Sequence, residues 1–151
     1  MITDEQARGI ALFCLFTLMD EKTALAAAHK AVAAAKAASP RASRSPSDVA
    51  LVTILRKTFD SHRKQLARNR PIEAPTRWSF PDGVDVEAWT KFHKDSSDGE
   101  IVSLVLAKIL KFPEEAIAEG LGVSLGTLKY RLGKGMRQLG VALGRSQMAR
   151  A

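Results

Sequence analysis

Large hydrophobic residues recur along the first part of the chain at the spacing of α-helices. Residues 5–19 carry Ile10, Phe13 and Phe16 among apolar side chains on nearly every side, which predicts a helix buried over most of its surface. Residues 23–38 include ten alanines, and alanine favours helix and lets neighbouring helices approach closely. The stretch 39–48, with two prolines and four serines, predicts a loop.

The rest of the chain continues the helical pattern. Residues 48–69 place apolar side chains on one face and predict a third helix, which ends before Pro71. Residues 71–99 hold three prolines, two glycines and both tryptophans, and predict a linker with one short helix near 84–93, whose aromatics pack on a neighbouring helix. Apolar residues then predict a helix over 100–111 and further helices to about residue 143. Strand-like alternation never persists, so the predicted fold class is all-α.

This pattern divides the 151 residues into two small helical domains, 1–70 and 100–151, joined by the linker 71–99. Small domains bury a modest share of their surface, so each half would gain from packing against the other or against a partner. The sequence leaves that packing and the oligomeric state open.

The composition of the chain argues against several kinds of functional site. The single cysteine, Cys14, excludes a disulfide within the chain, and His29, His62 and His93 do not share a metal-binding spacing. The apolar run 9–19 is too short to span a bilayer, and the acidic start MITDEQ does not resemble a signal peptide. We therefore expect a cytoplasmic protein with no membrane span, no metal and no cofactor. No pairing of nucleophile and base supports an enzyme.

Charge is distributed in blocks. The net charge of +7 arises from a neutral segment 1–37, a basic segment 38–77 (+6), an acidic segment 78–119 (−5) and a basic segment 120–151 (+6). Two basic blocks suggest two contact surfaces for a polyanion such as DNA. Solvated helix faces would explain the same charges equally well.

The segment 114–135, EEAIAEGLGVSLGTLKYRLGKG, predicts a helix-turn-helix. Ala118 is small where two helices cross, and Gly122 permits the sharp turn between them. The second helix of such a motif can lie in the major groove of DNA. A helical hairpin used only for packing is the alternative. Ser124 can cap the second helix, and the outward residues that follow it, and thus the candidate DNA contacts, are Thr127, Lys129, Tyr130, Arg131 and Lys134.

Residues 100–139 resemble the C-terminal domain, region 4, of bacterial sigma factors of the extracytoplasmic-function type. The stretch EEAIAEGLGVSLGTLKYRL follows that family's pattern EEIAExLGVSxGTVKxRL, apart from one additional residue beside the acids. The resemblance implies that the last helix contacts the −35 promoter element. The residues at the positions of those contacts are Ser124, Thr127, Lys129, Tyr130, Arg131 and Lys134. Residues 1–70 resemble region 2 in layout, which implies that a basic helix contacts upstream or melted DNA. The bases assigned to that contact are Arg63, Lys64, Arg68 and Arg70.

The second helix departs from the sigma-factor pattern. The family carries a motif of the type DxVQExF there, whose acids dock on RNA polymerase, whereas residues 26–32 are AAAHKAV, with Lys30 at the position of a glutamate. Reversal of a charge at a docking contact opposes binding. One hypothesis is a sigma-factor-like DNA-binding protein in transcription initiation or its control, with RNA polymerase core as a possible partner. The alternative is a sigma-derived protein-interaction module that uses Ala26, His29 and Lys30 to bind another regulatory protein.

Overall fold

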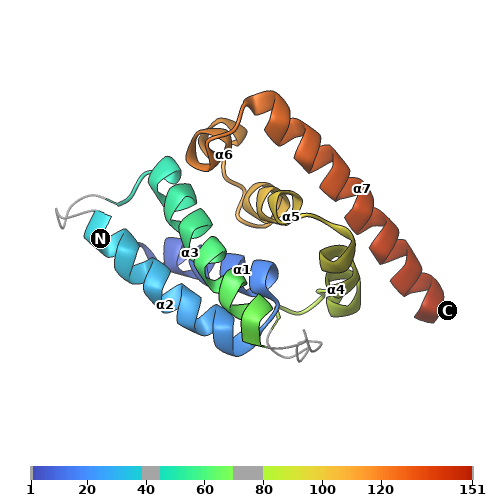
Figure 1. Ribbon diagram of the computed structural model, residues 1–151. Coiled ribbons are helices and arrows are strands. Elements are labelled where there is room, and N and C mark those ends of the chain that lie inside the picture. Colours follow the sequence, from blue (N-terminus) through green and yellow to red (C-terminus); the bar gives the residue numbers. More distant parts are fainter. Residues whose placement is uncertain (1, 39–44, 70–79, 151) are drawn as a thin grey trace.

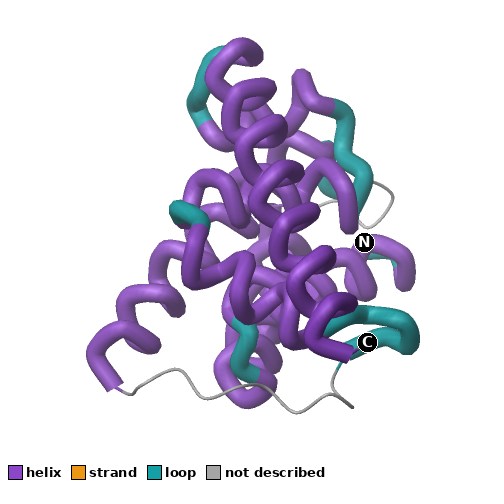
Figure 2. The backbone as a smooth tube through the Cα atoms, turned by 90° about the vertical axis from the view of Figure 1, so that its right-hand side faces the viewer, coloured by secondary structure: helices purple, strands orange, loops and turns teal. Residues whose placement is uncertain are grey.

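The described part of the chain folds mainly into α-helices (Figure 1). In this computed structural model the described residues are 2–38, 45–69 and 80–150, with the side chains of 67–69 and 145–150 left out. No strand occurs in these ranges, and Figure 2 shows helix and loop along them, so the all-α prediction is confirmed. The elements are α1 (Asp4–Leu18), α2 (Glu21–Ala38), α3 (Asp48–Asn69), α4 (Val86–Asp95), α5 (Asp98–Leu104), the π-helix η2 (Val105–Ile109), α6 (Glu114–Leu121) and α7 (Leu125–Arg150).

The first three helices pack against one another and bury the first part of the core. α1 is buried on several sides, as its apolar composition predicts, whereas α2 turns a face of alanines inward. Because alanine ends at Cβ, α2 can lie close to both neighbours. The buried residues include Ile10, Phe13, Cys14 and Phe16 of α1, Ala24, Ala27, Ala31 and Ala35 of α2, and Leu51, Val52, Leu55 and Phe59 of α3.

α4 carries the aromatic side chains of the predicted linker onto α1. Asp85 caps this helix by accepting a hydrogen bond from the Ala88 N–H at 3.1 Å. The Trp89 ring lies edge-to-face on Phe16 at a centroid distance of 4.7 Å, and Phe80 contacts Phe16 in the same manner at 5.4 Å. These aromatics therefore pack on a neighbouring helix, as predicted. Trp78 lies outside the described residues.

The predicted helix 100–111 begins earlier and changes its hydrogen bonding midway. Ser97 caps α5 in a reciprocal arrangement with Glu100, so the helix starts at Asp98. α5 continues without a break into η2, where the Leu110 N–H bonds to the Val105 carbonyl at 3.0 Å. The segment ends at Lys111, whose φ of 59° is left-handed and prevents continuation of the helix.

The N-terminal and C-terminal parts of the chain pack together through α3 and α6 (Figure 1). α1 also contacts η2, and α7 runs past α5 and α4. α7 reaches Arg150, beyond the predicted end near residue 143. The described residues before 70 and after 99 thus share a boundary, which places α6 next to α3.

Candidate nucleic-acid interface

The turn between α6 and α7 is built around a glycine. Gly122 adopts a φ of 70°, a left-handed conformation that a side chain would strain, and its N–H bonds to the Ala118 and Glu119 carbonyls. The Val123 N–H bonds to the Ala118 carbonyl at 3.0 Å and completes the C-terminal cap of α6. The chain therefore reverses within three residues, in the manner that the sequence predicts for a helix-turn-helix.

Ser124 starts α7. Its hydroxyl accepts a hydrogen bond from the Thr127 N–H at 3.1 Å and donates one to the Thr127 hydroxyl at 2.9 Å. Leu128 and Leu132, one turn apart, are 0% and 6% exposed and fix this part of α7 against the core. The first turns of α7 consequently have a defined orientation, with one side anchored and the other in solvent.

Five of the six candidate residues of this motif are exposed, and four of them lie together at the N-terminal end of α7. Ser124, Thr127 and Lys129 are exposed, and 67% of Tyr130 is accessible. The structure thus brings two hydroxyls, an ammonium and a phenol together at the N-terminal end of α7. This set could donate hydrogen bonds to phosphate oxygens or to base edges.

The other two candidates turn toward α5. The Lys134 ammonium lies 3.8 Å from a carboxylate oxygen of Glu100, which is itself buried. The guanidinium of Arg131 lies over Gly99, so close that a Cβ on that glycine would sit 3.2 Å from its Cζ and Nε. Helical spacing places both residues on the outer sides of α7, but α5 packs alongside and engages them.

The candidate bases of α3 are only partly described. Arg63 pairs with Asp98 at the start of α5, with 3.5 Å between Nε and Oδ1, and Lys64 is exposed. Arg68 lies in the last turns of α3, and its side chain is outside the described set. Arg70 lies outside the described residues altogether.

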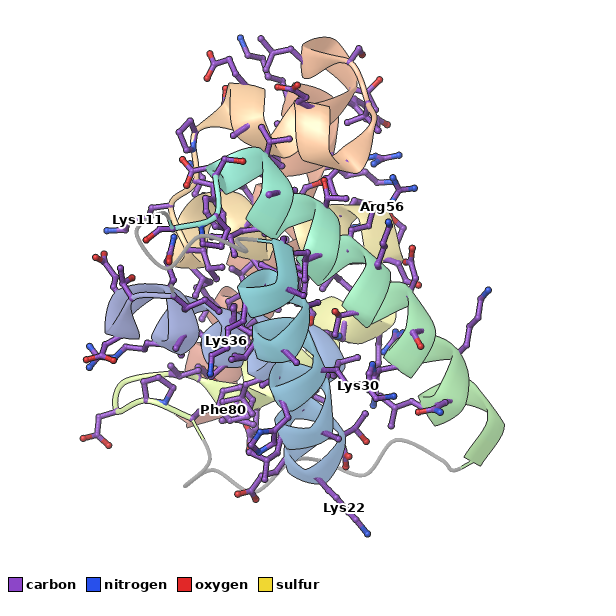
Figure 3. The ribbon with its side chains drawn as sticks, turned by 90° about the vertical axis from the view of Figure 1, so that its left-hand side faces the viewer. Lys22, Lys30, Lys36, Arg56, Phe80 and Lys111 are labelled. Atoms are coloured by element: carbon purple, nitrogen blue, oxygen red, sulfur yellow. The ribbon has the colours of Figure 1, made fainter. Side chains whose placement is uncertain are left out.

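The outer face of α2 forms a separate surface. Ala26, His29 and Lys30 are all exposed, together with Leu25, which is 62% accessible. Figure 3 shows Lys22, Lys30 and Lys36 on this helix, and after Glu21 at its start α2 carries no acid. This α2 face is therefore cationic around one large apolar side chain.

Arg56, on α3 (Figure 3), was not among the predicted site residues. Its Nη1 donates a hydrogen bond of 2.7 Å to the Leu121 carbonyl at the end of α6, and its Nε lies 3.9 Å from Asp60. It lines a groove of about 280 Å³ shared by α3, α5 and the helix-turn-helix, with Arg131 and Asp98 also in its wall. No local pattern signals this contact, because 65 residues separate its partners.

Other kinds of site find little support in the described part of the chain. No cluster of three or more His, Cys, Asp and Glu side chains there could hold a metal ion. Burial raises the pKa of the Cys14 thiol to about 12, and a neutral thiol is a poor nucleophile. Within the same ranges, none of the helices combines the length and hydropathy that crossing a bilayer requires.

Comparison with known proteins shows which solved structure shares the fold of this chain. No protein-family model and no curated protein matches the sequence. Among solved structures, the chain matches the sigma factor RpoE from Bartonella quintana, determined as a co-crystal with the anti-sigma factor NepR. The match covers 92% of each chain with a TM-score of 0.72 at 19% sequence identity. The fold is sigma-factor-like. It extends over α1–α3 as well as over the helix-turn-helix from which the resemblance was first inferred.

Proposed function

We propose that this protein binds duplex DNA through α6 and α7 and acts in bacterial transcription initiation or its regulation, in the cytoplasm and without catalysis. The observation that carries the proposal is the exposed set Ser124, Thr127, Lys129 and Tyr130 on the solvent side of a helix that Leu128 and Leu132 anchor from behind. A helix-turn-helix contacts DNA with this end of its second helix. The sigma-factor-like fold supports the same function.

The exposed residues suit different parts of the duplex. Lys129 would neutralise a phosphate, whereas Thr127 and Tyr130 would donate hydrogen bonds to phosphates or base edges. Lys64 and Arg68 of α3, together with Arg70, would form a second phosphate contact. Because phosphate contacts release counterions, DNA affinity should fall steeply as salt is raised.

The test is a titration of a fluorescently labelled duplex of about 30 base pairs at low salt. We expect Lys129→Ala to weaken binding several-fold and to reduce the salt dependence by about 0.9 in the slope of log K against log[salt]. Lys36→Ala on α2 is the matched control, since it removes the same charge from an exposed helical site far along the chain. Absence of duplex binding by the wild-type protein at low salt would overturn the proposal.

A second candidate function is a protein contact through the α2 face. Exposed Leu25 supplies apolar area, and Lys22, Lys30 and Lys36 favour an acidic partner. Pull-down from a bacterial lysate, repeated with Leu25→Asp, distinguishes the candidates. Recovery of RNA polymerase supports the transcriptional proposal. A protein other than polymerase that binds the wild type and not Leu25→Asp supports the α2 contact.

A further inference from the structure

Cations from two separate helices converge on the first turn of α5. Arg63 arrives from α3 and pairs with Asp98, whereas Lys134 arrives from α7 and pairs with Glu100. Between these two acids, Gly99 carries the guanidinium of Arg131 directly against its backbone. Residues 98–100, called the acidic turn below, thus hold three of the side chains assigned to DNA contact.

The acidic turn is fixed in place. Ser97 accepts a hydrogen bond from the Glu100 N–H at 3.3 Å, and its hydroxyl donates to the Glu100 carboxylate at 3.1 Å. Gln138 of α7 fixes the two residues before Ser97. Its side-chain amide donates a hydrogen bond to the Asp95 carbonyl at 2.9 Å and accepts one from the Ser96 hydroxyl at 2.8 Å. The Glu100 carboxylate therefore faces Lys134 in a set geometry.

We propose that the acidic turn restrains DNA binding by pairing Arg63 and Lys134 with its carboxylates and by packing Gly99 against Arg131, in place of contacts with DNA phosphates. The inference rests on the proposed DNA-binding function and concerns the regulation of the same site. A carboxylate and a phosphate oxygen present the same chemistry to an ammonium or a guanidinium, so a cation held by one is less available to the other. Duplex DNA must compete with Asp98 and Glu100 before it gains these contacts.

The restraint also connects the two basic regions of the chain. Arg63 belongs to the first basic block, and Arg131 and Lys134 belong to the last, yet all three meet one acidic segment between them. Arg63 can join a second phosphate contact at α3 only after it leaves Asp98.

Three variants test the restraint, with the same labelled duplex as probe. Asp98→Asn releases Arg63 at a half-exposed position, and we expect about three-fold tighter binding. Adding Glu100→Gln should bring the gain to about ten-fold and steepen the salt dependence, because more cations then release counterions from DNA. Gly99→Ala leaves the net charge unchanged and places a methyl group where the Arg131 guanidinium rests, so we expect a smaller gain of about two-fold.

Glu87→Gln, at an exposed position of α4, is the control for loss of one negative charge. Thermal melting checks that Glu100→Gln, which alters a buried cap, leaves the fold intact. If the wild type binds DNA and the acidic-turn variants gain no more than Glu87→Gln, the restraint is overturned and the proposed function stands. If neither the wild type nor any variant binds DNA, the proposed function is wrong, and the proposed restraint, which rests on that function, is wrong as well.

Discussion

Gly120 of α6 lies directly against Val52 of α3, with no room for a side chain between the two helices. A Cβ at position 120 would sit 2.5 Å from Val52 Cγ1, 2.6 Å from Val52 Cβ and 3.2 Å from the Val49 carbonyl oxygen. Such distances are far inside van der Waals contact, so any larger residue would force α3 and α6 apart. This contact joins the N-terminal and C-terminal parts of the chain and positions the helix-turn-helix.

We expect Gly120→Ala to destabilise the protein by about 2 kcal/mol, because the clash outweighs the better helix propensity of alanine. Urea unfolding measures the loss. Gly140→Ala is the matched control, since nothing lies within 4 Å of a Cβ at that exposed helical glycine. There the substitution should stabilise by about 0.5–1 kcal/mol. Gly120→Ala should cost less in a Val52→Gly background, because that change removes both Cβ and Cγ1 of Val52, and strictly additive effects would contradict the contact.

Arg56→Ala should destabilise by about 1–2 kcal/mol, because it removes a charged donor from the Leu121 carbonyl at the C-terminal end of α6. Lys57→Ala, at the next and equally exposed position of α3, should have little effect. Urea unfolding of the two variants gives the comparison. Equal effects would mean that the Arg56 hydrogen bond does not stabilise the contact between α3 and α6.

The helices could be predicted from sequence because their signals are local. Apolar spacing, the alanine run and the left-handed Gly122 each act over a few residues, and the structure follows them. The contacts between α3 and α6 have no such signal, since nothing in the local sequence around Val52 or Gly120 indicates that the two residues meet. The π-helix was missed because Val105–Ile109 continues an apolar run whose composition does not distinguish one helical hydrogen-bonding pattern from another.

Some residues of the candidate site could likewise be predicted from local signals, whereas others depend on tertiary packing. Residues facing solvent at the start of α7 follow from helical period and a cap, so Lys129 and Tyr130 could be placed in advance. The orientation of Arg131 and Lys134 depends on where α5 packs, which no spacing along α7 reveals. Asp98 belongs to the predicted linker and Glu100 begins the predicted helix 100–111. Their contacts with Arg63 and Lys134 follow only from the packing of α3 and α7 beside α5.

Ser103→Ala should stabilise the protein by about 1 kcal/mol. The Ser103 hydroxyl is buried in α5 and has no hydrogen-bond partner within the described structure, so it loses its hydration without compensation. Alanine also has the higher helix propensity. Ser96→Ala is the contrasting variant, because it removes the 2.8 Å hydrogen bond to Gln138 and should destabilise. Thermal or urea unfolding would contradict the account if both changes had the same sign.

The Cys14 thiol should resist alkylation in the folded protein. It is 1% exposed, and burial raises its pKa to about 12, so the thiolate is scarce and shielded at pH 8. Reaction with a thiol reagent should be negligible under native conditions and should reach one equivalent in urea, since the chain has one cysteine. Rapid native labelling would show that α1 opens readily and that its packing against α2 and α3 is weaker than described.

His93 should make the fold sensitive to mild acid. Burial lowers its pKa from 6.5 to about 4; its hydrogen bond to the Phe16 carbonyl opposes this shift, and the nearby charge of Arg63 reinforces it. The neutral ring donates through Nε2 to that carbonyl at 2.7 Å, which holds α4 on α1. Between pH 6.5 and 4 the unfolded chain binds a proton that the folded ring resists, so stability rises with pH across this window and falls as pH is lowered.

By this linkage, the free energy of unfolding should be about 2 kcal/mol smaller at pH 5 than at pH 8 on account of His93 alone. His93→Gln retains an N–H donor for the Phe16 carbonyl and cannot titrate, so it should remove this part of the pH dependence. His29→Gln, on the exposed face of α2, should leave the pH profile unchanged. Urea unfolding at both pH values makes the comparison. If the free energy of unfolding of His93→Gln falls as much between pH 8 and pH 5 as that of the wild type, other groups cause the acid sensitivity.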